Sequence, residues 1–174
     1  MKSKKYNITK GLFIVYIIIL TWIILFKLQF DVSSIETMNL RSINLVPFAG
    51  SLIINNKVDI SEIILNVAIF IPFGIYICML KEEWSFIKKV IPIFITSLAF
   101  ETLQYIFALG ASDITDLIGN TLGGIIGIAV FMLLSKIFKN NTIKIINILA
   151  FIVTIIVVLF LGLSYFCKLI EISI

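Results

Sequence analysis

Residues 112–124 read SDITDLIGNTLGG, and this short polar stretch in a very apolar chain decides how the rest is interpreted. Its acidic and amide side chains recur at a spacing of i, i+3, i+7, which places them on one face of a helix: Asp113, Asp116 and Asn120. Glycine recurs at every fourth position from Gly119 through Gly123 to Gly127, a spacing that lets a second helix come close. The stretch therefore predicts the polar mouth of a membrane helix that packs tightly against a neighbour.

The composition is that of a membrane protein. The 174 residues are 60% hydrophobic and only 14% charged, with a mean hydropathy of +1.15, and a soluble domain of this length cannot hide so much apolar surface. The chain has no histidine, which removes the commonest side chain for proton transfer at neutral pH and for binding transition metals. The modest net charge of +4 indicates membrane topology and not a nucleic-acid partner, and we expect no cofactor.

Five apolar runs have close to the ~20 residues that a bilayer-spanning helix needs, and they lie at residues 11–30, 63–80, 90–109, 117–134 and 145–167. We therefore expect an all-α membrane protein, a bundle of five transmembrane helices that forms a single membrane domain over residues 1–174. The first run could instead be a signal peptide, but it is long for one and no small-residue cleavage site follows. The apolar side chains of the connection at residues 31–62 favour the membrane surface.

Lysine and arginine indicate how the chain is oriented. If the N-terminus lies inside, the inner segments carry ten Lys residues and the outer segments carry four Lys or Arg residues. Because cytoplasmic loops carry the excess of positive charge, this bias predicts a cytoplasmic N-terminus and an external C-terminus. Residues 112–124 then lie at the external face.

Residues 59–66, DISEIILN, and residues 113–120, DITDLIGN, repeat one pattern at an offset of 54 positions. Each copy opens a run directed from outside to inside. We therefore favour a parallel duplication of a two-helix unit, in which spans two and three correspond to spans four and five. Helix capping is the alternative, since Asp59 and Asp113 each fit an N-cap followed by an acid at N3. Capping does not explain the asparagine one turn deeper in each copy.

Polar residues that are unusual inside a membrane gather at one depth under this topology. Asn66 and Asn120 lie about one turn into their runs, and Glu101 lies ~12 Å below the outer end of the third run. An ionised carboxylate at a helix centre costs ~2.5–3.5 kcal/mol or more, so Glu101 implies a partner, a water-filled cavity or protonation. We predict an outward-facing polar pocket formed by Arg41, Asn44, Asn66, Glu101, Gln104, Asp113, Asp116 and Asn120.

Each member of this set also has a structural interpretation. Asp113 and Asp116 can be helix caps, and the two asparagines can form hydrogen bonds between helices, which are worth ~0.6–2 kcal/mol. For Glu101 a functional role outweighs a structural one, so it is the candidate catalytic residue if the protein catalyses a reaction. We expect no metal, and Asp113 and Asp116 are the candidate ligands if one binds.

Four motifs occur in a fixed order within residues 39–130: Arg41 with NLVPF at 44–48, NVAIFIPFG at 66–74, FETLQ at 100–104 and DITDLIGNTLGG at 113–124. In these motifs the chain resembles the VanZ-like family of bacterial membrane proteins. Many relatives carry an arginine three positions before the first aspartate of the last motif, where this chain has Gly110, so here Arg41 would have to neutralise the acids. The resemblance implies a multi-pass protein of the bacterial cytoplasmic membrane, in a family whose namesake is associated with teicoplanin resistance.

Three classes of function fit these residues, and the lipid bilayer is a partner in all of them. We favour a non-enzymatic cell-envelope protein that contributes to teicoplanin-type resistance. It would bind a lipid-linked wall precursor or alter the access of a lipoglycopeptide to it, with helix N-termini that favour anions. The first alternative is an intramembrane enzyme acting on a polyprenyl or glycolipid headgroup, with Glu101 as general acid or base and Mg²⁺ held by Asp113, Asp116 and Asn120. The second is a small proton-coupled transporter, whose few spans would favour a homodimer.

Overall fold

The computed structural model describes residues 2–26, 42–48, 53–54, 57–58, 60–109 and 112–172. The described chain is mostly helical, with long helices α1 (Lys2–Phe26), α3 (Ser61–Leu80), α4 (Phe86–Ile106), α5 (Ile114–Phe138) and α6 (Thr142–Ile172). A 3₁₀ turn, η1 (Lys139–Asn141), joins the last two, and four strands of two residues each complete the fold: β1 (Ile43–Asn44), β2 (Ile53–Ile54), β3 (Lys57–Val58) and β4 (Ser112–Asp113).

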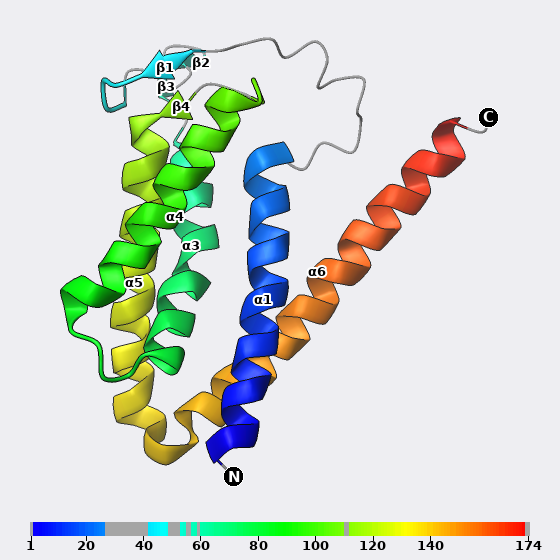
Figure 1. Cartoon of the computed structure of the whole chain (residues 1–174). Coiled ribbons are helices and arrows are strands. Elements are labelled where there is room, and N and C mark those ends of the chain that lie inside the picture. The colour runs from blue at the N-terminus through cyan, green and yellow to red at the C-terminus, as the bar shows by residue number, and fades with distance from the viewer. Residues whose placement is uncertain are drawn as a thin grey trace.

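The chain runs back and forth between the two ends of the molecule, one long helix at a time. Helices α3, α4 and α5 lie side by side with α1 next to them, whereas α6 crosses the start of α1 and then leans away (Figure 1). The N-terminus, the turn at residues 81–85 and η1 lie at one end, and strands β1 and β4 lie at the other. Segments that the charge pattern assigns to one side of a membrane therefore share one end of the molecule.

Within the described parts of the chain, three stretches are long and apolar enough to cross a membrane: Tyr6–Leu25, Ser61–Leu80 and Ile114–Leu163, the last of which covers α5, η1 and most of α6. Helix α4 is not among them, and its apolar run is interrupted by Lys88, Lys89, Glu101 and Gln104. The helix bounds differ from the expected spans, since α1 begins at Lys2 and α4 ends at Ile106. The protein is thus a helical membrane protein, and the count of five spans stays a prediction.

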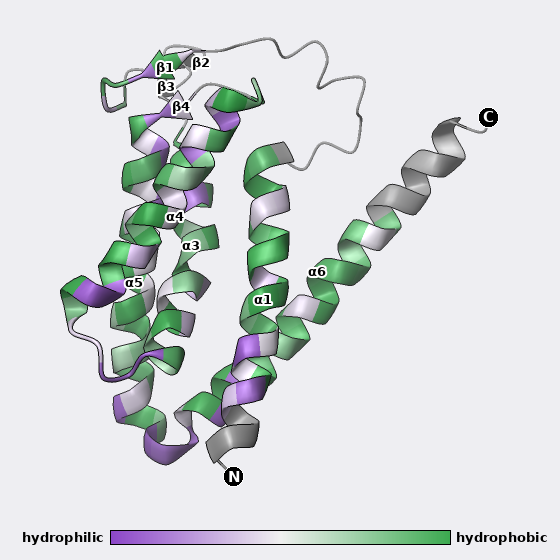
Figure 2. Ribbon diagram, viewed as in Figure 1, coloured by the Kyte–Doolittle hydropathy of each residue, from purple (hydrophilic) through white to green (hydrophobic). Residues whose placement is uncertain are grey.

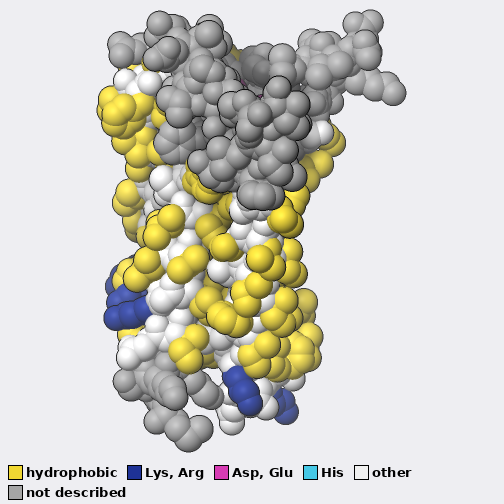
Figure 3. Space-filling view, turned by 90° about the vertical axis from the view of Figure 1, so that its right-hand side faces the viewer, with side chains coloured by type: hydrophobic (Ala, Val, Ile, Leu, Met, Phe, Trp, Pro, Cys, Tyr) yellow, Lys and Arg dark blue, Asp and Glu magenta, His cyan; other side chains and the backbone are white. Residues whose placement is uncertain are grey.

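The surface has the polarity that a bilayer requires. Hydrophilic residues gather toward the two ends of the molecule, and hydrophobic residues dominate the length between them (Figure 2). On the part of the face in Figure 3 that is not grey, hydrophobic side chains are spread over the surface, and the Lys and Arg residues lie in the lower half of the view. Side chains such as Ile18, Leu133 and Phe160 are more than half exposed, so lipid is their natural surroundings.

The tightest helix contact is between α3 and α5, and glycine makes it possible. A Cβ atom on Gly123 would run into the backbone carbonyl of Val67, and a Cβ on Gly127 would run into that of Ile71. Gly119 lies more loosely against Asn66, with 3.6 Å between its ideal Cβ and that of Asn66. The predicted close approach at the glycine spacing is confirmed, and the partner helix is α3.

A short parallel strand pair joins the polar connection to the start of α5. Strand β1 pairs with β4, with Ile43 opposite Ser112 and Asn44 opposite Asp113. The Ser112 N–H donates to the Ser42 carbonyl at 3.0 Å. This small sheet departs from the all-α expectation, and it places Asn44 beside the polar stretch at residues 112–124.

The two copies of the sequence repeat begin their helices differently. Asp113 is the N-cap of α5 and accepts a hydrogen bond from the Thr115 N–H, with Asp116 in the first turn, so the capping prediction is confirmed there. The N-cap of α3 is Ile60, which makes no side-chain cap, so the predicted start at Asp59 is wrong by one residue. Asp59 itself lies outside the described residues. The proposed duplication stays a prediction.

Candidate functional site

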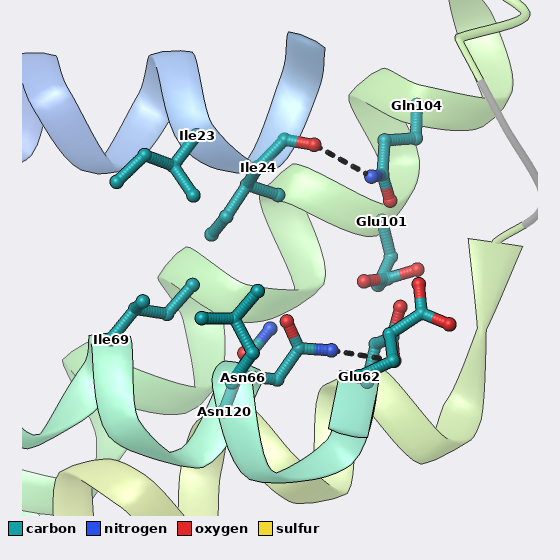
Figure 4. Close-up of a pocket in the computed structure, with 10 residues that line it drawn as sticks. Ile23, Ile24, Glu62, Asn66, Ile69, Glu101, Gln104 and Asn120 are labelled. Carbon is teal, nitrogen blue, oxygen red and sulfur yellow. Dashed lines mark hydrogen bonds between the residues drawn. The ribbon is translucent and has the colours of Figure 1, made fainter. Parts of the chain in front are cut away.

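A polar cavity of about 120 Å³ lies between four helices near the end of the molecule that carries β1 and β4 (Figure 4). Its lining comes from α1, α3, α4 and α5 and comprises Ile23, Ile24, Glu62, Leu65, Asn66, Ile69, Glu101, Gln104, Asp116 and Asn120. Five of the eight predicted pocket residues are among them. Helices that are distant in sequence thus bring the unusual polar side chains to one place.

Glu101 lies on α4 with only 4% of its surface exposed. One of its carboxylate oxygens accepts a hydrogen bond from the Asp113 backbone N–H at 2.9 Å. A buried carboxylate is costly unless hydrogen bonds replace the lost water. The segment that precedes α5 supplies two such donors, the Asp113 backbone N–H and the Ser112 side chain, and neither of them is a Lys or Arg side chain.

Asp113 lies beside the cavity and connects three parts of the site. One carboxylate oxygen accepts from the Thr115 N–H at 2.7 Å as the helix cap, and the other accepts from the Asn44 side-chain amide at 3.0 Å. The Asn44 carbonyl oxygen in turn accepts from the Val46 N–H at 3.1 Å. Neither Asp113 nor Asn44 is among the residues that line the cavity. Their hydrogen bonds fix the segment whose backbone N–H binds Glu101.

Asn66 and Asn120 approach the cavity from α3 and α5 (Figure 4). The Asn66 amide donates to the Asp116 carboxylate at 2.7 Å, which ties α3 to the first turns of α5. The Asn120 amide donates to the Ser97 hydroxyl on α4 at 3.0 Å. Both asparagines thus form hydrogen bonds between helices, as their structural interpretation predicts, and both also line the cavity.

Two buried acceptors at the cavity have no hydrogen-bond partner among the residues that the structure describes. The Gln104 amide nitrogen donates to the Ile24 carbonyl at 3.1 Å, which leaves its oxygen Oε1 unpartnered. The Asn120 oxygen Oδ1 is also unpartnered. Gln104 and Asn120 are only 2% and 1% exposed, and leaving a buried acceptor unsatisfied costs roughly 1–3 kcal/mol each.

The predicted set differs from the lining in both directions. Arg41 lies outside the described residues, so its predicted role at the acids has no structural counterpart here. Glu62 lines the cavity although the sequence interpretation gave it only a capping role. The repeat carried the signal, because Glu62 is the counterpart of Asp116. Nothing in the sequence indicates that α1 contributes to the cavity, because Ile24 binds Gln104 through its backbone carbonyl, which every residue has.

The carboxylates do not form an evident metal centre. Among the residues that the structure describes, no group of three or more His, Cys, Asp or Glu side chains is placed to hold a metal ion. Both oxygens of Asp113, one of the two candidate ligands, already accept hydrogen bonds. The described geometry therefore fits hydrogen bonding to a ligand better than it fits cation coordination through Asp113.

Fold and site together define a helical membrane protein with a polar cavity near one end. The VanZ/LLP1 family model matches residues 13–139, and the chain belongs to this family. It is 40% identical over 129 residues to Protein VanZ of Enterococcus faecium, covering 74% of this chain and 76% of that protein. No solved structure matches the chain. The matched region runs from α1 to η1 and contains every residue that lines the polar cavity.

Proposed function

We propose that this chain is a multi-pass protein of the bacterial cytoplasmic membrane that contributes to resistance against teicoplanin-type glycopeptides. It binds a lipid-linked wall component in its polar cavity, or alters access to that component, from the external side. The observation that carries the proposal is the buried Glu101 among amide side chains, near one end of an apolar bundle. Isolated structural hydrogen bonds would not require such a cavity.

The proposed topology has five spans, with the N-terminus inside. Support comes from the path of the chain, since each long helix runs from one end of the molecule toward the other (Figure 1). The turn at residues 81–85 and η1 share the end that holds the N-terminus, and the Lys-rich segments adjoin them. The cavity then faces outward, where lipid-linked wall precursors are used.

The test is glycopeptide susceptibility with matched variants. A susceptible host carries the wild-type chain, Glu101→Gln or Glu83→Gln, in equal membrane amounts, and the minimal inhibitory concentration of teicoplanin is measured. Glu83 is exposed in the turn at residues 81–85, so it controls for the change of chemistry. We expect a several-fold rise with wild type and Glu83→Gln, and no rise with Glu101→Gln. No rise with the wild-type chain would overturn the resistance role.

An enzyme acting on a lipid headgroup is the second candidate, because Glu101 is a carboxylate that lines the cavity and is fixed by a backbone donor. A positioned carboxyl group of this kind can transfer protons as a general acid or base. The purified protein would then convert a polyprenyl or glycolipid substrate with turnover, and Glu101→Gln would abolish it. Stoichiometric binding without product would leave the binding role alone.

A further inference from the structure

A second cavity, of about 260 Å³, is also bordered by α1 and α3. Its walls are apolar and come from α1, α3, the end of α5 and α6, including Ile19, Pro72, Ile75 and Val153. Two hydroxyl groups of its lining form hydrogen bonds within the protein. Tyr16 donates to the Ile69 carbonyl at 2.7 Å, and Thr154 donates to the Ala150 carbonyl at 2.8 Å. This cleft therefore suits a hydrocarbon chain.

The two cavities follow one another along both helices. On α3, Asn66 and Ile69 line the polar cavity, and Pro72 and Tyr76 line the apolar cleft, at helical spacing on one face. On α1 the order is the same, with Ile23 in the first and Ile19 in the second. Asn66 and Tyr76 are ten residues apart on α3, roughly 15 Å at helical rise. Tyr16 of the second lining donates a hydrogen bond to Ile69 of the first, so the two spaces border one another at this contact.

The polar cavity is built to accept hydrogen bonds. Gln104 Oε1 is buried and unpartnered, and its orientation is determined, because the Ile24 carbonyl can only accept from the amide nitrogen. Glu101 lies one turn earlier on the same helix, and the Gln104 side chain is drawn beside it in Figure 4. Asn120 Oδ1 is a second buried acceptor without a partner among the described residues, and the Glu101 carboxyl group lines the same cavity. Such acceptors favour a group that carries O–H or N–H donors over a phosphate, whose oxygen atoms are themselves acceptors.

We propose that the two cavities form one site for an amphiphile, which places a hydroxyl- or amine-bearing headgroup against Gln104 and Glu101 and a single hydrocarbon chain in the apolar cleft. The proposal rests on the proposed function and names the chemical class that the site binds. It differs from the expectation that helix N-termini would favour an anion, because the two buried groups without a described partner, Gln104 Oε1 and Asn120 Oδ1, are hydrogen-bond acceptors.

The test uses the full chain in phosphatidylcholine nanodiscs and three chain-matched probes: dodecyl glucoside, dodecylamine and dodecyl phosphate, each with a photoreactive diazirine near the chain end. Crosslinked peptides are mapped by mass spectrometry, and the glucoside and amine arms distinguish the two donor classes. We expect at least one of these two to label the cleft-lining parts of α1, α3 or α6, and to do so at least tenfold more than the phosphate probe.

Two exposed valines on α6 provide a matched pair of variants. Val153 lines the cleft and is 58% exposed, and Val158 lies outside it and is 52% exposed, so tryptophan at either position leaves the buried core intact. Val153→Trp is expected to reduce labelling at least fivefold, whereas Val158→Trp leaves it unchanged. Gln104→Leu removes the acceptor and is expected to abolish the preference over the phosphate probe, with thermal stability measured alongside.

Several outcomes would overturn the inference. They are equal labelling by the phosphate probe, equal labelling of the two valine variants, and crosslinks from α6 to a second copy of the chain in place of the probe. Resistance without probe preference would refute the amphiphile site and leave the proposed function standing. Probe binding with these preferences but no resistance would refute the function and leave the site.

Discussion

At the scale of single residues, Gly123 shows how little room separates α3 from α5. A methyl group there would collide with the Val67 carbonyl, which is backbone and cannot turn aside. We predict that Gly123→Ala destabilises the protein by about 1–3 kcal/mol, as overpacking does, despite the better helix propensity of alanine. Thermal unfolding of the purified protein in one detergent measures the difference.

Gly162→Ala is the control for this prediction. Gly162 also lies within a long helix, but a Cβ there would meet nothing within 4 Å, so alanine brings only the propensity gain of roughly 1 kcal/mol. The two substitutions should shift the unfolding temperature in opposite directions. Equal shifts would mean that the α3–α5 contact is looser than the geometry indicates.

Residue identity also explains which part of the site could be predicted. Glu101, Asn66 and Asn120 could be recognised because a polar side chain inside an apolar run is costly unless it has a partner or a cavity. The structure shows that all three line one cavity. The Ile24 carbonyl was not recognisable, because a backbone acceptor carries no signature in the sequence.

At the scale of elements, the pairing of β1 with β4 holds the segment at residues 42–48 against the start of α5. The Asn44 amide donates to Asp113, and the Phe48 N–H donates to the Thr115 hydroxyl at 2.9 Å. We predict that Asn44→Ala increases amide hydrogen exchange in peptides that cover residues 42–48 and 112–116. Hydrogen–deuterium exchange with mass spectrometry provides the readout.

Leu45→Ala serves as the comparison, because Leu45 is adjacent but 71% exposed. It should leave the exchange in both peptides close to that of the wild type. If Asn44→Ala behaves in the same way, the side-chain bond to Asp113 does not hold the segment.

The strand pair also marks a limit of sequence-based reasoning about elements. Long helices are predictable from runs of apolar residues near ~20 in length, whereas strands of two residues have no alternation to detect. The paired residues of β1 and β4 lie 69 positions apart in the sequence, so only the tertiary structure brings them together. The N-cap of α5 was predictable from Asp113, but Ile60 at the start of α3 has no capping side chain to reveal it.

At the scale of the whole molecule, the orientation in the membrane can be tested by thiol labelling. In a variant with Cys78→Ala and Cys167→Ser, single cysteines replace Glu83, Asn140 or Val46, all exposed positions. We predict that a membrane-impermeant maleimide labels Val46→Cys in intact cells. Glu83→Cys and Asn140→Cys should react only after permeabilisation, because they share the end that holds the N-terminus.

The reverse labelling pattern would place the polar cavity at the cytoplasmic side. Wall precursors on the outer surface could then not reach it. Labelling of Glu83→Cys and Asn140→Cys from opposite sides would refute the five-span path itself, since the chain would then cross the membrane an odd number of times between them, whereas α4 and α5 require two crossings.

Asp113 connects the segment outside the cavity to the carboxylate that lines it. Its side chain receives Asn44 from the surface segment, its cap begins α5, and its N–H holds the buried carboxylate of Glu101. We expect that a protein or lipid that displaces the outer segment also moves that N–H and the acid, without entering the cavity. The hydrogen bond from the Asn44 amide to Asp113 thus links the outer segment to the buried acid.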